Sequence, residues 1–161
     1  MLQYSEEARF LGVTFDSELS FENHILDIVK RSKKRLNLLK ALKGKTWGAD
    51  PNTILYTYKA FIRPILEYSC VLFAHVDQKL LNKIQAIETE AIKIAHNLAP
   101  WTSNYWCYTL INFTPILERL KNLAKKFLDK NKKDELIGDL LNSSKSSNLG
   151  HHGPVYKAVN W

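Results

Sequence analysis

The feature that most constrains this chain is one apolar stripe that runs through residues 21–43 with the period of an α-helix. Its members recur at steps of three and four residues: Phe21, Ile25, Ile28, Val29, Ser32, Leu36, Leu39 and Leu42. This spacing places them on one face of a helix, and other parts of the chain must cover that face. Ser20 is a suitable N-cap and Gly44 a suitable stop, so we expect a long helix between them.

Three further helices are expected after Gly44, and each has a recognisable start or stop. Asp50 is a good N-cap and Pro51 suits the first helical position, while Pro64 is expected to kink or end this second helix. Pro100 is expected to end the third helix. The expected ranges are 51–63, 77–99 and 115–128, with a short fifth helix at 134–141 and an apolar core segment at 65–76.

The two ends of the chain differ from the helical middle. FLGVTF at residues 10–15 favours one short strand, whose partner lies in residues 1–8 or outside the chain. Residues 142–154 contain four serines, two glycines and one aliphatic residue, so we expect the tail to be disordered. The fold class is therefore expected to be mainly α, a four-helix bundle with one short N-terminal β-strand and a disordered C-terminal tail. Its expected core comprises Ile25, Leu36, Leu39, Tyr58, Phe61, Ile84, Ile87, Leu117 and Leu120.

The charge balance favours an acidic partner. The 161 residues include 23 Lys and Arg against 16 Asp and Glu, which gives a net charge of +7. Residues 1–29 hold six acidic residues and one basic residue, so the remaining 22 basic and ten acidic residues leave +12 on residues 30–161. A basic domain of this size most often meets nucleic acid.

The basic charge is concentrated in one run. Eight of the sixteen residues from 30 to 45 are basic and none is acidic. A solvated helix face is the simpler explanation, but such a face usually mixes signs, because like charges four residues apart repel. Unmixed charge favours a phosphate partner. Trp47 follows in a glycine-flanked loop, where base or sugar contact and core packing are equally compatible with the sequence. The expected nucleic-acid-binding residues are Lys30, Arg31, Lys33, Lys34, Arg35, Lys40, Lys43, Lys45 and Trp47.

Two weaker signals lie further along the chain. Residues 101–113 are rich in Trp, Tyr and Phe, and we expect them to fill the gap between two helices, with base stacking as the alternative. A second basic stretch is interrupted by acidic residues, so it is weaker evidence for a phosphate partner. Its members are Arg119, Lys121, Lys125, Lys126, Lys130, Lys132 and Lys133.

No arrangement of residues indicates catalysis. The adjacent acids Asp134 and Glu135 lie in a polar stretch, no glycine-rich phosphate loop occurs, and the five histidines lack metal-ligand spacing. We expect no catalytic residue, no metal site and no cofactor in this chain. Cys70 and Cys107 form no C-x-x-C pair, and the N-terminus is too polar for a signal peptide. An intracellular chain, nuclear or cytoplasmic rather than secreted, with no membrane partner, is expected.

Several short segments together resemble one family, the reverse transcriptases of non-long-terminal-repeat retrotransposons of the jockey-like, LINE type. FLGV at residues 10–13, followed by Asp16, Leu19, Phe21 and His24-Ile25, resembles a segment of these enzymes. YKAFIRPILEY at residues 58–68 is similar to their YKA.IRPILEYG, with Ser69 where glycine is usual. Four shorter segments also resemble the family and occur in its order along the chain: RLNLL at 35–39, KTWGADP at 45–51, APW at 99–101 and PILER at 115–119. The resemblance covers roughly residues 9–130.

The resemblance implies the thumb and post-palm region of an RNA-directed DNA polymerase. Residues 1–15 would be a remnant of the palm-end strand, 16–141 a thumb-like helical domain and 142–161 a flexible tail. The family's Tyr-x-Asp-Asp, which binds Mg²⁺ in the parent enzyme, does not occur here. The implied function is binding of an RNA/DNA template–primer duplex through backbone phosphates, with the missing palm and fingers as further partners and no polymerase activity. The alternative is a degenerate retroelement product or a helical protein-interaction module without a nucleic-acid function.

Overall fold

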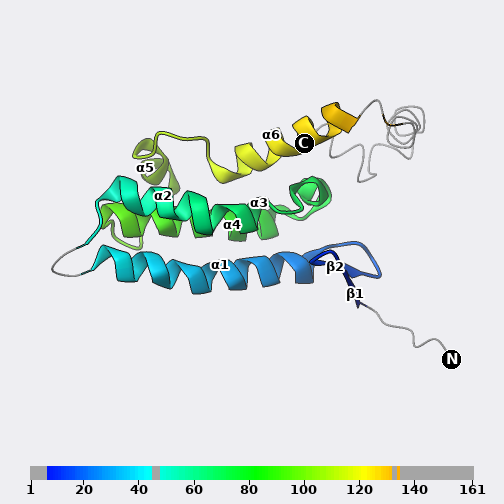
Figure 1. The fold of residues 1–161 in the computed structure, drawn as a ribbon, viewed down its shortest axis with the longest axis horizontal. Helices are drawn as coiled ribbons and strands as arrows, with labels where there is room; N and C mark the ends of the chain where they lie inside the picture. The colour runs from blue at the N-terminus through cyan, green and yellow to red at the C-terminus, as the bar shows by residue number, and fades with distance from the viewer. Residues whose placement is uncertain (1–6, 45–47, 132–133, 135–161) are drawn as a thin grey trace. The chain divides into compact units, whose positions relative to one another are not determined.

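A computed structural model describes residues 7–44, 48–131 and 134, and this part of the chain is mainly helical (Figure 1). The expected fold class is therefore confirmed. The elements in chain order are β1 (Glu7–Phe10), β2 (Val13–Asp16), α1 (Glu22–Lys43), α2 (Pro51–Phe61), α3 (Arg63–Glu67), the 3-10 helix η1 (Cys70–His75), α4 (Gln78–His96), α5 (Asn104–Thr109) and α6 (Ile116–Asn131). Several predictions concern residues outside the described ones, apart from Asp134. They are the disordered tail, the fifth helix at 134–141 and the nucleic-acid contacts of Lys45 and Trp47.

The described residues fall into two compact units. The helical unit contains residues 25–68 and 78–117, and within it α2 packs against α3 and α4 while α5 packs against α4. The hairpin unit contains the described residues of 1–24, 69–77 and 118–161. Most of α1 and all of α2 to α5 therefore belong to the helical unit, which also holds most of the predicted site.

The hairpin unit corrects the prediction of a single strand at residues 10–15. β1 and β2 form an antiparallel pair in which Glu7 faces Asp16 and Phe10 faces Val13. Leu11 and Gly12 form the turn between them, with φ values of 47° and 82°. A two-residue hairpin turn of type I′ needs positive φ at both central positions, and glycine adopts such values without strain. The leucine–glycine pair predicted inside the strand is thus the turn.

The start of α1 is held by a network around Asp16. Its carboxylate accepts hydrogen bonds from the backbone N–H groups of Ser20 and Phe21, each at 2.8 Å. Slight burial raises the pKa of Asp16, but the hydrogen bonds from Ser20 and Phe21 outweigh burial and hold that pKa below its usual value. Phe21 has a φ of 57° and the helix begins one residue later, at Glu22, whose N–H lies 3.3 Å from Ser20 Oγ. The predicted cap is therefore shared between Asp16 and Ser20.

His24 ties three segments of the hairpin unit together. The ring is buried, Nδ1 accepts a hydrogen bond from the Thr14 N–H at 3.4 Å, and Nε2 lies 2.9 Å from Ser69 Oγ. Because Nδ1 accepts, the proton of the neutral ring is on Nε2, which donates to Ser69. Ser69 itself has a φ of 61°, in the left-handed region that favours glycine. Glycine, which the resembled pattern has at this position, would adopt that backbone conformation without strain.

The turn between α1 and α2 depends on two glycines. Gly44 ends α1 with a φ of 57°, as predicted. Gly48 returns so closely to the helix end that a Cβ atom there would lie 1.7 Å from the Lys43 carbonyl oxygen. Asp50 then caps α2 as expected, because its carboxylate accepts from the N–H groups of Asn52 and Thr53. The helix breaks at Ile62, between the end of α2 and the short α3, and Pro64, which was expected to kink or end the second helix, lies in the first turn of α3.

The core of the described residues agrees with most of the predicted positions. Ile25, Leu36, Leu39, Tyr58, Ile84, Ile87 and Leu120 are each at most 1% exposed. Phe61 was predicted wrongly, since it ends α2 and is 57% exposed, and Leu117 is only half-buried. The last member of the α1 stripe, Leu42, is 37% exposed because the helix ends one residue later.

The aromatic stretch 101–113 differs most from its prediction. Trp101, Tyr105 and Trp106 are 86%, 72% and 63% exposed, so they do not fill a gap between helices. The short helix α5 turns Cys107 inward instead, and that side chain is fully buried. A six-residue helix offers few inward positions, so Tyr105 and Trp106 are left at its surface, while Trp101 lies in the turn before the helix.

Candidate nucleic-acid interface

Four of the basic residues predicted to bind nucleic acid make contacts within the protein. Arg31 pairs with Asp27 at 3.0 Å on the same face of α1. Lys40 pairs with Glu90 on α4, also at 3.0 Å. These ion pairs are solvent-exposed and contribute little, so they do not exclude a ligand. The charge on α1 is nevertheless less uniform in space than in sequence.

Arg35 and Lys43 have a clearer structural role. Arg35 Nη1 donates to the carbonyl oxygen of Phe61 at 2.7 Å, and Lys43 Nζ donates to the carbonyl oxygen of Ala95 at 2.8 Å. Both acceptors lie in the last turn of a helix, α2 and α4 respectively. Carbonyl groups at helix ends lack partners in the helix and carry the negative end of its dipole. These two side chains therefore join α1 to the ends of its neighbours.

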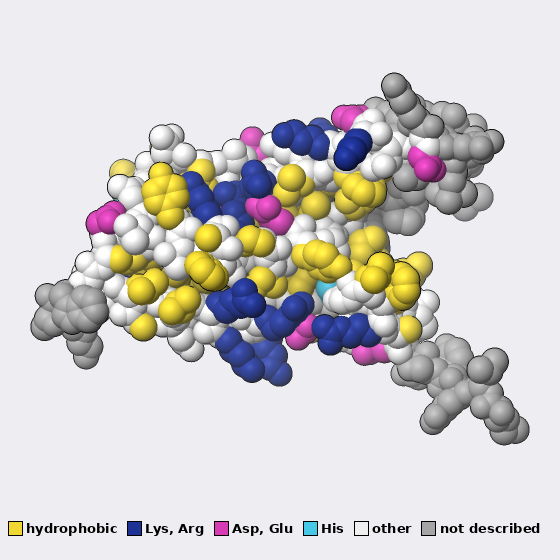
Figure 2. Space-filling view, in the orientation of Figure 1, with side chains coloured by type: hydrophobic (Ala, Val, Ile, Leu, Met, Phe, Trp, Pro, Cys, Tyr) yellow, Lys and Arg dark blue, Asp and Glu magenta, His cyan; other side chains and the backbone are white. Residues whose placement is uncertain are grey.

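The remaining lysines of α1 surround a hollow on the helical unit, which we call the lysine groove. Lys30, Lys33 and Lys34 line it together with Lys83 of α4, and its apolar lining comes from Leu26, Val29 and Ala86. The volume is about 560 Å³ and none of the residues that line it is acidic. Figure 2 shows Lys and Arg side chains gathered over α1. The structure thus brings together three predicted residues and adds Lys83, which the sequence analysis missed.

The lysine groove is electrostatically unfavourable as it stands. Lys30 and Lys34 are one helical turn apart on α1, and Lys33 lies between them. Like charges at this spacing destabilise a helix, and no carboxylate among the lining residues offsets them. An anion in the hollow would remove the repulsion, and the apolar lining would lower the local dielectric around it.

A second charged cluster lies inside the helical unit and is fully paired. Glu88 of α4 is completely buried, and its Oε1 accepts a hydrogen bond from the Tyr58 hydroxyl at 3.2 Å. The Ile116 N–H donates to Oε2 at 2.6 Å. Arg63 Nη2 lies 3.8 Å from Glu88, and Arg63 Nε lies 3.2 Å from Glu67. We call these five residues the buried ionic cluster.

The buried ionic cluster shifts the pKa values of its members through desolvation. Burial raises the pKa of Glu88, although the Ile116 hydrogen bond and the Arg63 charge partly oppose this. Burial and the neighbouring Glu88 charge raise the pKa of Tyr58 well above its usual value. Such shifts can mark functional sites, but they also arise in structural ion-pair networks, and every member here has a partner.

The family-like segment 58–68 supplies Tyr58, Arg63 and Glu67 to this cluster. Arg63 also donates to the Thr114 carbonyl and stacks over the Phe113 ring, 5.0 Å from its centroid. The segment that carries the resemblance therefore holds α2, α3 and α4 together with the start of α6. Glu88 could have been found from sequence as an acid in the middle of an apolar helical stripe, since a buried position there demands a partner.

Other predicted features are less informative. Lys121, Lys125, Lys126 and Lys130 of the second basic stretch are exposed on α6 and Arg119 is half-buried, while Lys132 and Lys133 lie outside the described residues. Cys70 and Cys107 are both buried, and no disulfide bond joins them. Among the described residues, no three His, Cys, Asp or Glu side chains are grouped closely enough to hold a metal ion. None of the described helices is both long and apolar enough to cross a membrane.

Comparison with known proteins indicates a distant relation to RNA-directed DNA polymerases of mobile elements. The chain is 26% identical over 135 residues to the RNA-directed DNA polymerase from mobile element jockey of Drosophila melanogaster, and 23% identical over 130 residues to that of Drosophila funebris. It is 20% identical over 123 residues to the probable RNA-directed DNA polymerase from transposon X-element of Drosophila melanogaster.

These matches cover 76–81% of this chain but only 14% of each relative, so the chain spans about one-seventh of the length of the curated relatives it matches. No family model matches the chain. No solved structure matches it either. The chain is therefore distantly related to retrotransposon reverse transcriptases, and which part of them it corresponds to is a matter for proposal.

Proposed function

We propose that this chain is a thumb-like segment of a retrotransposon reverse transcriptase and holds the phosphate backbone of a template–primer duplex in the lysine groove. The observation that carries this proposal is the unpaired charge: four lysines from two helices line one hollow and no acid lies among them. A segment related to polymerases would meet RNA/DNA duplexes, and backbone phosphates are the anions that such a groove fits.

The proposal narrows the set of predicted contact residues. Lys30, Lys33 and Lys34 are the primary phosphate ligands, and Lys83 joins them. Four other predicted residues do not line the lysine groove and would contribute only long-range attraction to a duplex held there: Arg31, Arg35, Lys40 and Lys43. Lys45 and Trp47 stay predictions. In this proposal the segment supplies no catalytic residue or cofactor, and the palm and fingers of the parent polymerase supply the Mg²⁺ site.

The proposal is tested by measuring how affinity for a blunt RNA–DNA hybrid depends on salt. Neutralising a phosphate releases counterions, so the logarithm of affinity falls with the logarithm of salt by about 0.7–0.9 per contact. Replacing Lys30, Lys33 and Lys34 together by Gln should lower this slope by about two to three units. The matched control replaces Lys125, Lys126 and Lys130, three exposed lysines of α6, by Gln. Equal slope changes in both variants would show a general charge effect and contradict the groove.

A helical interaction module is the second candidate, and one observation favours it. Phe10 and Leu11, at the tip of the hairpin, are 65% and 74% exposed. Apolar side chains at such a tip suit contact with another polypeptide, whether the rest of a polymerase or an unrelated protein. A wild-type chain that fails to bind any RNA–DNA hybrid at low salt would favour this candidate over the first.

A further inference from the structure

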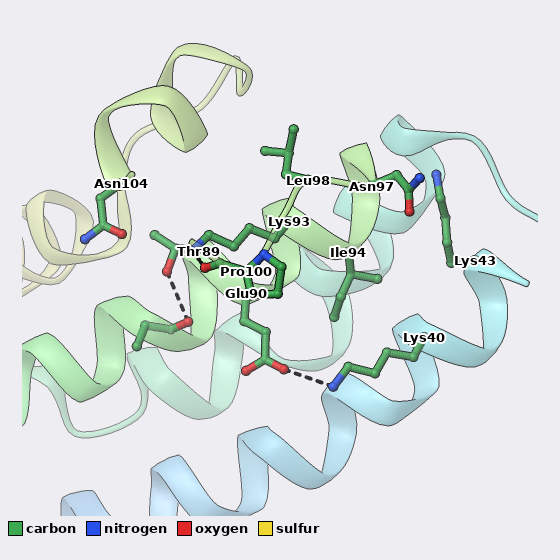
Figure 3. A pocket seen from close by; sticks show the side chains of 11 residues that line it. Lys40, Lys43, Thr89, Glu90, Lys93, Ile94, Asn97, Leu98, Pro100 and Asn104 are labelled. Atoms are coloured by element: carbon green, nitrogen blue, oxygen red, sulfur yellow. Dashed lines mark hydrogen bonds and ion pairs between the residues drawn. The ribbon is translucent and has the colours of Figure 1, made fainter. Parts of the chain in front are cut away.

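A second hollow of the helical unit adjoins the lysine groove. Its volume is about 670 Å³, and it lies between α1, α4, α5 and the segment that joins the last two (Figure 3). Lys40 and Lys43 reach it from α1, Lys93 and Asn97 from the end of α4 and the residue after it, and Asn104 from α5. Ala86 of α4 lines both hollows, so the two are neighbours along that helix.

The lining of this hollow favours an anionic ligand with polar edges. Three lysines face one carboxylate, that of Glu90, whose pair with Lys40 is exposed on both sides and therefore weak. Lys43 and Lys93 each donate one hydrogen bond to a backbone carbonyl, and an ammonium group has three donors, so both keep donors for phosphate oxygens. The amide side chains of Asn97 and Asn104 can both donate and accept.

Three exposed aromatic residues are sequence neighbours of residues that line the same hollow. Trp101 follows the lining residue Pro100, and Tyr105 and Trp106 follow the lining residue Asn104. The rings of Tyr105 and Trp106 meet edge to face, with centroids 5.8 Å apart. Their outer faces remain in water at 86%, 72% and 63% exposure for Trp101, Tyr105 and Trp106. We call these three residues the aromatic rim.

Lysines beside exposed aromatic rings are the combination that binds single-stranded nucleic acid. Ammonium groups follow the backbone phosphates, and each unstacked base places its π-face on a ring. A duplex offers the phosphates but keeps its bases stacked inside, so it cannot use the aromatic rim. A protein partner would suit the rings alone, but three lysines at the hollow favour a polyanion.

We propose that the hollow and the aromatic rim bind a single-stranded nucleic-acid segment that continues from a duplex held in the lysine groove. This inference rests on the proposed function for the position of the duplex, while the single-strand surface itself stands on residues outside that groove. The strand runs along α4 past Ala86, its phosphates contact Lys93 and Lys43, and its bases stack on Trp101 and Trp106.

The test compares three probes by fluorescence anisotropy: a blunt RNA–DNA hybrid, the same hybrid with a single-stranded overhang, and a free oligo-dT strand. The wild-type chain should bind the overhang hybrid more tightly than the blunt one. Replacing Trp101 or Trp106 by Ala should weaken oligo-dT binding about 5- to 150-fold, the range for loss of one stacked base, and should abolish the advantage of the overhang. Binding of the blunt hybrid should be unchanged.

The matched control is Tyr56→Ala, because Tyr56 is a 67% exposed aromatic residue on α2 that lines neither hollow. It should leave binding of all three probes unchanged. Tryptophan variants that bind oligo-dT as tightly as the wild type would overturn the single-strand proposal. If those variants instead removed concentration-dependent self-association, the rim would be a protein contact and the proposal would be equally wrong.

The two proposals fail separately in this design. Substitution of Lys30, Lys33 and Lys34 should weaken the blunt hybrid strongly and oligo-dT little. If the lysine variant leaves the blunt hybrid unaffected while the tryptophan variants lose oligo-dT, the duplex groove is wrong and the single-strand surface holds. If the lysine variant binds the blunt hybrid weakly and the tryptophan variants bind oligo-dT like the wild type, the single-strand proposal is wrong and the groove proposal is supported.

Discussion

Two charged regions of the helical unit use their charges in opposite ways. In the buried ionic cluster, every charge meets a partner: Arg63 has Glu67 and Glu88, and Glu88 also accepts from Tyr58 and Ile116. In the lysine groove, four cations meet at the surface with no acid in the lining. Charges that pair inside a protein hold elements together, whereas charges left unpaired around a hollow are available to an external partner. The contrast separates residues that hold the helical unit together from residues that we propose bind phosphate, and only α4 contributes to both regions.

The largest expected effect comes from opening the buried ionic cluster. Glu88→Ala leaves the Arg63 charge buried beside Glu67 alone and removes the acceptor of Tyr58 and Ile116, so the free energy of unfolding should fall by about 3–5 kcal/mol. Chemical denaturation measures it. Glu90→Ala, two residues away in an exposed pair, should cost at most about 1 kcal/mol. Equal losses of unfolding free energy in both variants would contradict a larger structural role for the buried pair of Glu88 than for the exposed pair of Glu90.

The next largest loss of stability is expected on the buried face of α1, the helix that also contributes to the lysine groove. Leu39 is fully buried, and Leu39→Ala should lower the free energy of unfolding by about 2–5 kcal/mol through lost burial and the cavity left behind. Leu38 is its sequence neighbour and is 47% exposed, so Leu38→Ala should change stability by about 0.5 kcal/mol or less. If the thermal melts of the two variants coincided, the apolar stripe of α1 would lie at the surface.

The pH dependence of the unfolding free energy tests the environment of Glu88, and its expected size is intermediate. Its folded pKa lies above the ordinary value of 4.5, so the folded chain binds this proton more tightly than the unfolded chain. The stability that the protonated side chain contributes is fully present below pH 4.5 and is lost as pH rises through the raised pKa. The unfolding free energy of wild type relative to Glu88→Gln should therefore decline across that window in denaturation curves at several pH values. A constant difference would place the carboxyl group in solvent.

The α1 helix shows how much of this architecture the sequence could predict. Its apolar stripe, its stop at Gly44 and the Asp50 cap of α2 all depend on neighbours within a few residues, and local patterns report such neighbours well. The hairpin turn was missed because Leu11 and Gly12 have strand-like neighbours, and only the pairing of β1 with β2 shows that they turn.

The site was less predictable because it depends on contacts between distant segments. Lys83 lies 49 residues from Lys34 in sequence, and nothing local indicates that both line one hollow. Arg35 and Lys43 look like surface charges until their carbonyl partners on other helices are known. The exposure of Trp106 could not be predicted either, because it depends on how little of the short α5 faces inward.

The smallest expected effect is a gain in stability. Lys34→Gln removes repulsion with Lys30, one turn away, and should raise the free energy of unfolding by about 0.2–0.5 kcal/mol while it weakens hybrid binding. Precise urea titrations at low salt, where repulsion is least screened, are needed to resolve this change. A variant that is less stable than the wild type would show that Lys34 has a stabilising partner and belongs with the paired charges.

Lys83 provides the most direct test of the claim that unpaired lysines around the groove hold phosphates. Lys83→Gln should lower the salt slope for a blunt RNA–DNA hybrid by about 0.7–0.9, the value for one lost phosphate contact. Lys79→Gln removes the same charge one turn earlier on α4, from a residue that does not line the groove, and should leave the slope unchanged. Equal slopes for the two variants would contradict a phosphate site in the groove.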